Sequence, residues 1–286
     1  MRYRWRMTGD PVMPSAGPDQ HSIRRAFADL ADGQVHFAEC GAADAAPLLL
    51  LHQTPRSWAE YRAVLPLLGR TRRAIAMDII GFGDSVRPTW PGTIERWADV
   101  AVQLLDHLGI ERADLVGHHT GGVVAVELAA AYPQRVGRVV LSSTPYTDDD
   151  FRRARAERPP IDEVEVRSDG SHLGELWRRR QAFYPPERPD LLHAFVLDAL
   201  KVIDDLEYGH RAVAAYRMED RLGLVRQPVL VIRASGDQFA SPDATALADR
   251  LTDARIVDIE GAMVPLPDQM PVEFANVVLE FLGGDR

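Results

Sequence analysis

Short apolar runs alternate along this chain with longer segments of helical spacing. Residues 47–51 read Pro-Leu-Leu-Leu-Leu, which is typical of a strand buried on both faces of a parallel sheet. Further strand-like runs lie at 73–78, 114–117, 138–143, 228–233 and 254–259. Segments with helical spacing lie at 93–108, 123–132 and 271–282. Strands that alternate with helices predict right-handed crossovers onto a mostly parallel sheet, so the predicted fold class is α/β.

Three segments depart from this pattern. Residues 1–20 have little apolar periodicity and contain several prolines, which predicts an irregular tail. Residues 26–39 alternate and predict two strands joined at the hairpin dipeptide Asp32-Gly33. Residues 146–220 are rich in charge and helix formers and have no buried strand run. We therefore predict a helical cap over 146–220, inserted into a core made of 21–145 and 221–286.

Composition narrows the functional classes. A chain of 286 residues that is 46% hydrophobic can bury one large core. The net charge of -9 argues against nucleic acid as a partner. Cys40 is the only cysteine, so a disulfide framework or a zinc quartet is excluded. No apolar segment suited to a signal peptide or a membrane span follows the N-terminal arginines. We expect a cytoplasmic monomer or homodimer that acts on a small molecule and has no membrane partner.

The most informative stretch is Gly117-His118-His119-Thr120-Gly121. It follows a strand-like run and precedes a long apolar helix pattern. A strand, a sharp Gly-x-x-x-Gly turn and an immediate helix form a nucleophile elbow, which lifts its middle residue above the sheet. The middle residue is normally Ser, Asp or Cys, but here it is His119.

Four motifs, taken in order, resemble the α/β-hydrolase fold superfamily, in particular its epoxide hydrolase and haloalkane dehalogenase branch. The loop 52–58, His-Gln-Thr-Pro-Arg-Ser-Trp, is similar to the family's His-Gly-x-Pro-x-Ser-Trp, with Gln53 in place of glycine. Residues 78–85 resemble its Asp-x-x-Gly-x-Gly-x-Ser turn, and 117–121 occupy the elbow. Residues 235–237, Ser-Gly-Asp, resemble its acid-bearing loop. The resemblance implies a mostly parallel sheet flanked by helices, with an inserted cap, over nearly everything after residue 20.

The departures from the family pattern concern the catalytic residues. Asp237 stands at the position of the family's acid, but Ala262 or Val264 occupies the place of its histidine, and no histidine follows His210. The usual nucleophile and the usual base are therefore both absent. An imidazole has an ordinary pKa near ~6.5 and acts as a base or a nucleophile without a partner. We interpret His119 as a base that stands at the nucleophile's position.

This interpretation leaves several functions open. His119 activates water to hydrolyse an ester, lactone or epoxide, or it acts as a nucleophile, with the backbone amides of Thr54 and Thr120 as the oxyanion hole. Alternatively, it moves a proton in a lyase, decarboxylase, isomerase or cyclase reaction. A third reading is a ligand-binding pseudo-hydrolase without catalysis. The plant gibberellin receptors resemble this chain in placing an aliphatic residue at the histidine position, although they keep the serine.

The remaining candidates surround the expected pocket between core and cap. His210, near the return of the cap to the core, is a candidate second acid or base. His118 is expected to make structural hydrogen bonds, and we include it with Trp58 and Tyr208 among the substrate-binding candidates. The arginine run 178–180 is expected to be a solvated face or a set of helix-terminal charges. No cluster suits a metal and no glycine pattern suits a dinucleotide, so we expect no cofactor and a largely apolar substrate.

Overall fold

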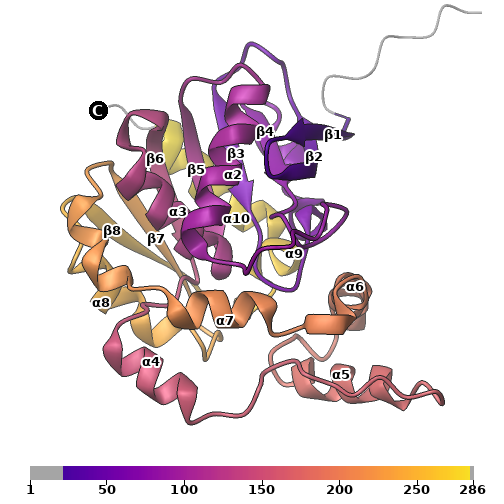
Figure 1. Ribbon diagram of the computed structural model, residues 1–286. Coiled ribbons are helices and arrows are strands. Elements are labelled where there is room, and N and C mark those ends of the chain that lie inside the picture. Colours follow the sequence, from indigo (N-terminus) through magenta and orange to yellow (C-terminus); the bar gives the residue numbers. More distant parts are fainter. Residues whose placement is uncertain (1–21, 284–286) are drawn as a thin grey trace, which may run out of the picture.

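One eight-stranded sheet forms the centre of the protein in the computed structural model, which describes residues 22–283 (Figure 1). Its strand order is β1-β2-β4-β3-β5-β6-β7-β8. The strands are β1 (Arg24–Leu30), β2 (Gly33–Cys40), β3 (Pro47–Leu51), β4 (Arg73–Met77), β5 (Ala113–His118), β6 (Val136–Ser142), β7 (Val229–Ala234) and β8 (Ala254–Ile259). The irregular tail predicted over 1–20 lies outside the described residues.

The predicted topology is confirmed. β1 and β2 form an antiparallel hairpin that closes where Leu30 pairs with Gly33, and β2 runs antiparallel to β4. From β4 onwards all neighbours in the sheet are parallel, which places the carboxyl ends of these strands at one edge. Ligands of open α/β sheets bind at this edge, so the fold itself indicates where a site belongs.

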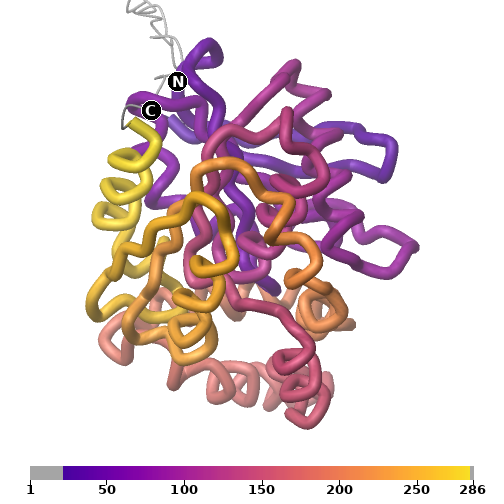
Figure 2. Tube along the Cα trace, turned by 90° about the vertical axis from the view of Figure 1, so that its left-hand side faces the viewer, coloured from indigo at the N-terminus to yellow at the C-terminus, as the bar shows by residue number. Residues whose placement is uncertain are grey.

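Helices cover both faces of the sheet (Figures 1 and 2). Alternate residues of β3 divide between two buried clusters: Leu49 and Leu51 pack with the α2 and α3 side, and Leu48 and Leu50 pack with the α1 and α10 side. The core helices are α1 (Leu65–Leu68), α2 (Ile94–His107), α3 (Thr120–Ala131), α8 (Ala244–Ala248), α9 (Leu266–Gln269) and α10 (Pro271–Gly283). Burial on both faces explains why the central strands are continuously apolar.

The chain between β6 and β7 leaves the core and returns to it. Among its residues, all of which are described, the regular elements are helices and short helical turns, and no strand is present. The four longer helices are α4 (Asp149–Ala156), α5 (Ser171–Gln181), α6 (Pro189–Leu200) and α7 (Tyr208–Ala215). Figure 1 places them together below the sheet, and the same pink and orange segments lie at the bottom of Figure 2. We call residues 146–220 the inserted segment.

Buried polar contacts attach the inserted segment to the core. Arg56, whose side chain is fully buried, donates from Nε to Asp198 of α6 at 2.9 Å and from Nη2 to Asp268 of α9 at 2.9 Å. Ser57 Oγ donates to the other oxygen of Asp198 at 2.8 Å. Arg56 thereby joins three parts of the chain that are distant in sequence. In the described part of the chain, every helix is too short or too polar to cross a bilayer.

Candidate active site

The residue at the apex of the elbow is His119, directly after β5 and before α3. Its backbone has φ 48° and ψ −113°, a conformation that non-glycine residues rarely adopt. The glycines beside it make this turn possible. A Cβ on Gly117 would lie 2.3 Å from the carbonyl oxygen of Gly121, and one on Gly121 would lie 1.9 Å from that of Leu51. The sequence pattern therefore produces the strained strand-to-helix turn of a nucleophile elbow.

Below the apex, the imidazole of His119 meets a buried carboxylate. Its Nε2 lies 2.7 Å from Oδ2 of Asp237, whose side chain is 0% exposed, and neither atom has a further partner among the described residues. Oδ1 of Asp237 accepts the backbone N–H of Phe239 at 2.9 Å. Burial by itself would raise the pKa of Asp237, but the neighbouring His119 and this N–H group lower it to about 2. The carboxylate is therefore ionised at neutral pH and stabilises positive charge on His119.

The preceding residue, His118, has a different environment. Its ring is fully buried, and Nε2 donates to the carbonyl oxygen of Val264 at 2.8 Å while Nδ1 lies 3.0 Å from Oγ of Ser142. Burial lowers its pKa to about 3, and the charge of His119 acts in the same direction. His118 is thus a neutral hydrogen-bonded residue that connects the elbow to the loop after β8.

That loop carries the position at which the family places its histidine. Val264 is buried in the same apolar cluster as α2 and α3, and Ala262 is buried on the opposite side of the sheet. Neither side chain accepts or donates a proton. Within the described residues, the histidine in contact with Asp237 is the one at the elbow, so acid and imidazole are kept together although the positions have changed.

The loop after β3 lies beside the start of α3. Oγ1 of Thr54 lies 2.9 Å from Oγ1 of Thr120, so the two hydroxyls hydrogen bond to each other. Thr120 is the first residue of α3, where a backbone N–H has no acceptor within the helix. Gln53, which replaces the family's glycine, donates from Nε2 and from its backbone N–H to the two oxygens of buried Glu60 at 2.5 and 3.0 Å. Burial raises the pKa of Glu60 to about 7.

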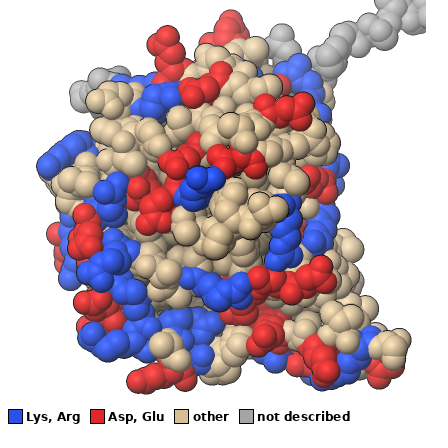
Figure 3. All heavy atoms as spheres, viewed as in Figure 1, with Lys and Arg blue, Asp and Glu red and all other residues tan. Residues whose placement is uncertain are grey.

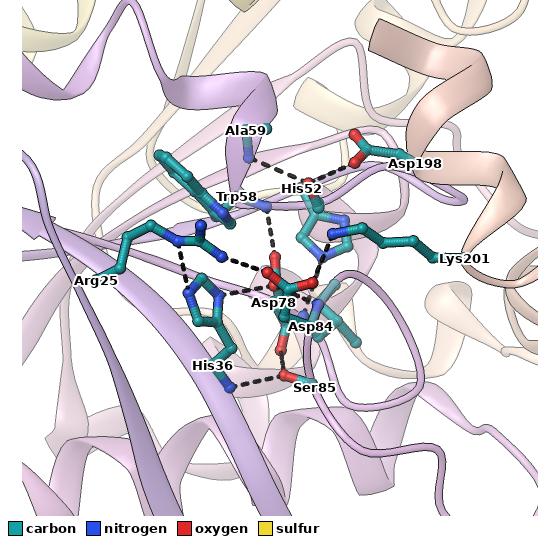
Figure 4. Close-up of polar contacts among 12 residues, drawn as sticks. Arg25, His36, His52, Trp58, Ala59, Asp78, Asp84, Ser85, Asp198 and Lys201 are labelled. Atoms are coloured by element: carbon teal, nitrogen blue, oxygen red, sulfur yellow. Dashed lines mark hydrogen bonds and ion pairs between the residues drawn. The ribbon is translucent and has the colours of Figure 1, made fainter.

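A second polar network holds this loop against the turn after β4 (Figure 4). Oδ1 of Asp78 accepts the backbone N–H of Trp58 at 2.6 Å, and Oδ2 accepts that of Asp84 at 2.8 Å. Nδ1 of His52 donates to the carbonyl oxygen of Gln53 at 2.7 Å, and Nε2 accepts the N–H of Ile79 at 2.9 Å. Both ring nitrogens of His52 therefore make structural hydrogen bonds.

His119 faces a cavity of about 340 Å³ between the sheet edge and the inserted segment. Gln53, Thr54, His119 and Thr120 line it from the core. The inserted segment contributes aromatic, aliphatic and basic side chains, among them His210. The structure thus brings together four residues predicted from the sequence: His119, Thr54, Thr120 and His210. Nδ1 of His119 makes no hydrogen bond to a described residue, so the nitrogen remote from Asp237 is available for chemistry.

His210 has its own buried carboxylate. Its Nε2 lies 3.0 Å from Oδ2 of Asp162 and 3.4 Å from Nη2 of Arg180. Both oxygens of Asp162 also accept from Arg180. Burial would raise the pKa of Asp162, but Arg180 and His210 move it well below its usual range. Two histidines, each held through Nε2 by an aspartate, therefore face one cavity. Sequence reasoning missed Asp162, because it is one of many acidic residues in the segment.

Three residues expected to bind substrate lie outside the lining of this cavity. His118 is fully buried beneath the elbow. Trp58 is also buried, and its ring is covered by the guanidinium groups of Arg25 and Arg62. Tyr208 packs against Phe82 and Trp97 instead. We correct these expectations, because a loop motif identifies the neighbourhood of a side chain but not the direction in which it points.

The arginine run 178–180 lies in the last turn of α5, which agrees with the expectation of helix-terminal charges, but it is not wholly solvated. Arg178 is exposed as expected, but Arg180 is buried and pairs with Asp162, and both Arg179 and Arg180 line the cavity. One turn of α5 therefore has a solvated side and a side that faces the pocket. Apolar surface nevertheless forms most of the cavity wall, in line with the expectation of a largely apolar site, and the basic side chains are grouped in the part that the inserted segment contributes.

Two other clusters place histidine and carboxylate atoms together: His36 with Asp78 and Asp84, and His210 with Asp162 and Glu207. In both clusters cationic side chains already contact the carboxylates. Arg25 and Lys201 contact Asp84 (Figure 4). Arg180 contacts Asp162, and Arg155 contacts Glu207. The negative charge of these clusters is thus compensated within the protein.

With the fold and the geometry of the elbow established, comparison with known proteins assigns the chain to a class. Residues 46–262 match the alpha/beta hydrolase fold family, and the chain belongs to this family. The fold class and the family resemblance inferred from the motifs are thereby confirmed.

Individual relatives match in shorter segments. The chain is 46% identical over 100 residues to 2-hydroxymuconate semialdehyde hydrolase of Pseudomonas sp. (strain CF600), which covers 33% of this chain and 35% of that protein. It is 37% identical over 123 residues to bifunctional epoxide hydrolase 2 of Mus musculus, covering 41% and 21%. The enol-lactonase from Burkholderia xenovorans LB400 superposes with a TM-score of 0.76 over 91% of this chain and all of that one, at 22% identity. The matched segments span about a third or less of the lengths of the two curated relatives. The similarity to the enol-lactonase concerns the fold alone.

Proposed function

We propose that the protein hydrolyses a small carboxylic ester or lactone, with His119 as the general base that activates water. The observation that carries this proposal is the contact between Nε2 of His119 and buried Asp237, because it leaves Nδ1 at the cavity without a partner among the described residues. A histidine oriented by a carboxylate is the proton acceptor of many hydrolases. A relative with a hydrolase name supports hydrolysis as the reaction type.

The proposed steps follow from this arrangement. Nδ1 of His119 takes a proton from a water molecule as the water oxygen bonds to the carbonyl carbon. The N–H groups of Thr54 and Thr120 stabilise the oxyanion, while ionised Asp237 stabilises the imidazolium. The bond from carbon to the leaving oxygen then breaks, and we propose that protonated His210 donates a proton to that oxygen. His119 then releases its proton to solvent and His210 takes one up, which restores the starting state. The role of His210 is proposed because it faces the same cavity and is held by Asp162.

An ester or lactone is favoured over an epoxide by the composition of the cavity wall. Epoxides are weak acceptors that a phenol activates well, and no tyrosine lines the cavity among the described residues. Tyr208, which we expected to bind substrate, packs against Phe82 and Trp97. The start of α3, by contrast, is suited to an acyl oxyanion.

The test is steady-state turnover of 4-nitrophenyl esters and simple lactones by the wild type and by His119→Ala. We expect kcat/KM to fall at least ~100-fold, the usual scale for a general base. Turnover in H₂¹⁸O should place one solvent oxygen in the product acid. Near-wild-type rates in His119→Ala would overturn the assignment. Proton exchange without incorporation of solvent oxygen would indicate a lyase or isomerase, and ligand binding without any turnover would indicate a non-catalytic protein.

A further inference from the structure

The cavity wall formed by the inserted segment has a strong charge bias. Arg155, Arg158, Arg179 and Arg180 line it, and no aspartate or glutamate is among its lining residues in the described part of the chain. This bias is unexpected in a chain with a net charge of -9. His119 lines the same cavity from the sheet edge. The candidate catalytic histidine and the arginines therefore lie on opposite sides of the cavity.

Three of these four arginines form ion pairs with carboxylates outside the cavity lining. Such pairs position a guanidinium but leave part of its donor fork free for a ligand. The carboxylates that pair with them do not line the cavity. The pairs are Arg155 with Glu207 at 2.9 Å, Arg179 with Glu175 at 3.0 Å, and Arg180 with Asp162.

Arg158 differs from the other three because its guanidinium has no carboxylate partner among the described residues. Its backbone is nevertheless fixed. The N–H of Arg158 donates to the carbonyl oxygen of Arg155 at 3.2 Å, and Nη1 of Arg155 donates back to the carbonyl oxygen of Arg158 at 3.2 Å. The other three arginines of the wall are each paired with a carboxylate, so the guanidinium of Arg158 is the positive charge that a ligand can neutralise.

The apolar part of the wall lies beside this charge. Phe183 and Phe239 lie against each other with ring centroids 4.5 Å apart, and both line the cavity together with Phe151. The volume of about 340 Å³ is at the small end for ligand pockets, which limits the ligand to a compact molecule. A ligand with a short apolar chain, a reactive carbonyl at one end and an anionic group at the other would place these parts beside His119, the phenylalanines and Arg158, respectively.

Building on the proposed function, we propose that Arg158, assisted by Arg179, forms an anion subsite, and that the substrate is a small ester or lactone bearing a carboxylate remote from the scissile bond. Guanidinium groups recognise a planar carboxylate through paired N–H donors. The carboxylate also fixes which end of the substrate reaches His119. The class of substrate is therefore a half-ester or lactone of a short dicarboxylic acid.

The surface around the cavity fits an anionic ligand. Figure 3 shows basic side chains gathered at the lower left, over the region where α4 and α7 lie in Figure 1. A neighbouring pocket of about 350 Å³ shares Arg155 and His210 with the cavity and is also lined by Arg152 and Arg211. A local concentration of positive charge attracts anions and raises their rate of encounter.

Two matched substrates test the proposal. Mono-4-nitrophenyl glutarate carries a carboxylate, and the corresponding 4-nitrophenyl 4-carbamoylbutanoate replaces it with a neutral amide of the same shape. We expect the wild type to prefer the anion by about 10- to 100-fold in kcat/KM, the range for a hydrogen bond to a charged group. The ratio should fall to within about threefold of unity in Arg158→Gln/Arg179→Gln. The control is Arg153→Gln, an exposed arginine of α4 outside the lining, which should keep the wild-type ratio.

A binding measurement separates this inference from the catalytic proposal. Calorimetry of glutarate with the intact His119→Ala protein should detect binding, and adding Arg158→Gln should weaken it at least ~10-fold. If neither ester is hydrolysed but glutarate binding depends on Arg158, the subsite stands and the proposed function fails. An unchanged substrate ratio in the double variant, glutarate binding independent of Arg158, or tighter binding of inorganic phosphate than of glutarate would each overturn the carboxylate subsite.

Discussion

Nε2 of His119 lies 2.7 Å from Oδ2 of Asp237, so the acid of this fold contacts the residue at the nucleophile position directly. In a serine hydrolase the acid holds a histidine that in turn activates the serine. Here His119 takes the place of both the serine and the histidine. The chemistry that remains is that of an oriented imidazole, which is a base rather than a hydroxyl nucleophile.

The first prediction concerns Asp237→Asn. Asparagine keeps Oδ1, which accepts the N–H of Phe239, but it removes the charge that stabilises protonated His119. We expect kcat/KM to fall about 100-fold or more, with little change in thermal stability at pH 7. Asp258→Asn is the control, since Asp258 is an exposed acid paired with Arg233 on the outer strands. Full activity in Asp237→Asn would contradict the role of this contact.

The second prediction concerns reagents directed at activated serines. No hydroxyl stands at the elbow apex, so a fluorophosphonate should leave the wild type unlabelled. His119→Ser alone should also remain unlabelled, because Val264 supplies no base. Adding Val264→His returns a histidine to the loop after β8, and this double variant should be labelled at residue 119. Mass spectrometry of the intact protein and of its peptides detects the label and locates it. Labelling of the wild type at any serine would show that another nucleophile is present.

The third prediction uses the pKa of His118, which is about 3 in the folded protein. The unfolded value is near ~6.5, so the neutral ring contributes stability that is present above pH 6.5 and lost as the pH falls towards 3. Between pH 7 and 5 this loss amounts to about 2 kcal/mol. Glu60 acts in the opposite direction, because its raised pKa gives stability that is lost as the pH rises towards 7. The informative quantity is therefore the difference between variants.

We accordingly expect His118→Asn to be less stable than the wild type at pH 7 but to lose about 2 kcal/mol less between pH 7 and pH 5. Urea unfolding at the two pH values gives both free energies. His107→Gln is the matched control, because His107 is an exposed histidine in the last turn of α2, and it should follow the wild type. Parallel pH dependence of wild type and His118→Asn would show that His118 is not the titrating group.

The parts of the molecule that the sequence predicted are those with a strong local signal. Leu48 to Leu51 are apolar because β3 is buried on both faces, and the glycines around His119 are required by close backbone contacts. Such constraints leave a recognisable pattern at short range. The strands, the hairpin and the elbow were predictable for this reason.

The contacts across the cavity had no such signal. Asp162 meets His210 from 48 residues away, and Arg158 reaches the cavity from a turn whose composition is that of a solvated loop. An arginine that faces a pocket and one that faces solvent look alike in the sequence, because long basic side chains suit both. Trp58 and Tyr208 failed as substrate-binding candidates for the converse reason: their neighbourhood was predictable, but their orientation depends on packing that only the fold determines.

The last prediction concerns Arg56, the buried link between the loop after β3, α6 and α9. Its side chain is 0% exposed and donates to Asp198 and Asp268, and Glu60 lies 3.8 Å from Nη1, so removing the guanidinium leaves three carboxyl groups without a counter-charge. We expect Arg56→Ala to lower the free energy of unfolding by about 3–5 kcal/mol, because breaking a buried ion pair from one side leaves uncompensated charge. Arg62→Ala is the control: Arg62 is exposed, lies over the ring of Trp58 and should change stability little. Adding Asp198→Asn to Arg56→Ala should recover part of the loss, since one of the unpaired charges is then gone. Urea titration of the four proteins at pH 7 tests this, and equal stability of Arg56→Ala and Arg62→Ala would show that the inserted segment is attached to the core by other contacts.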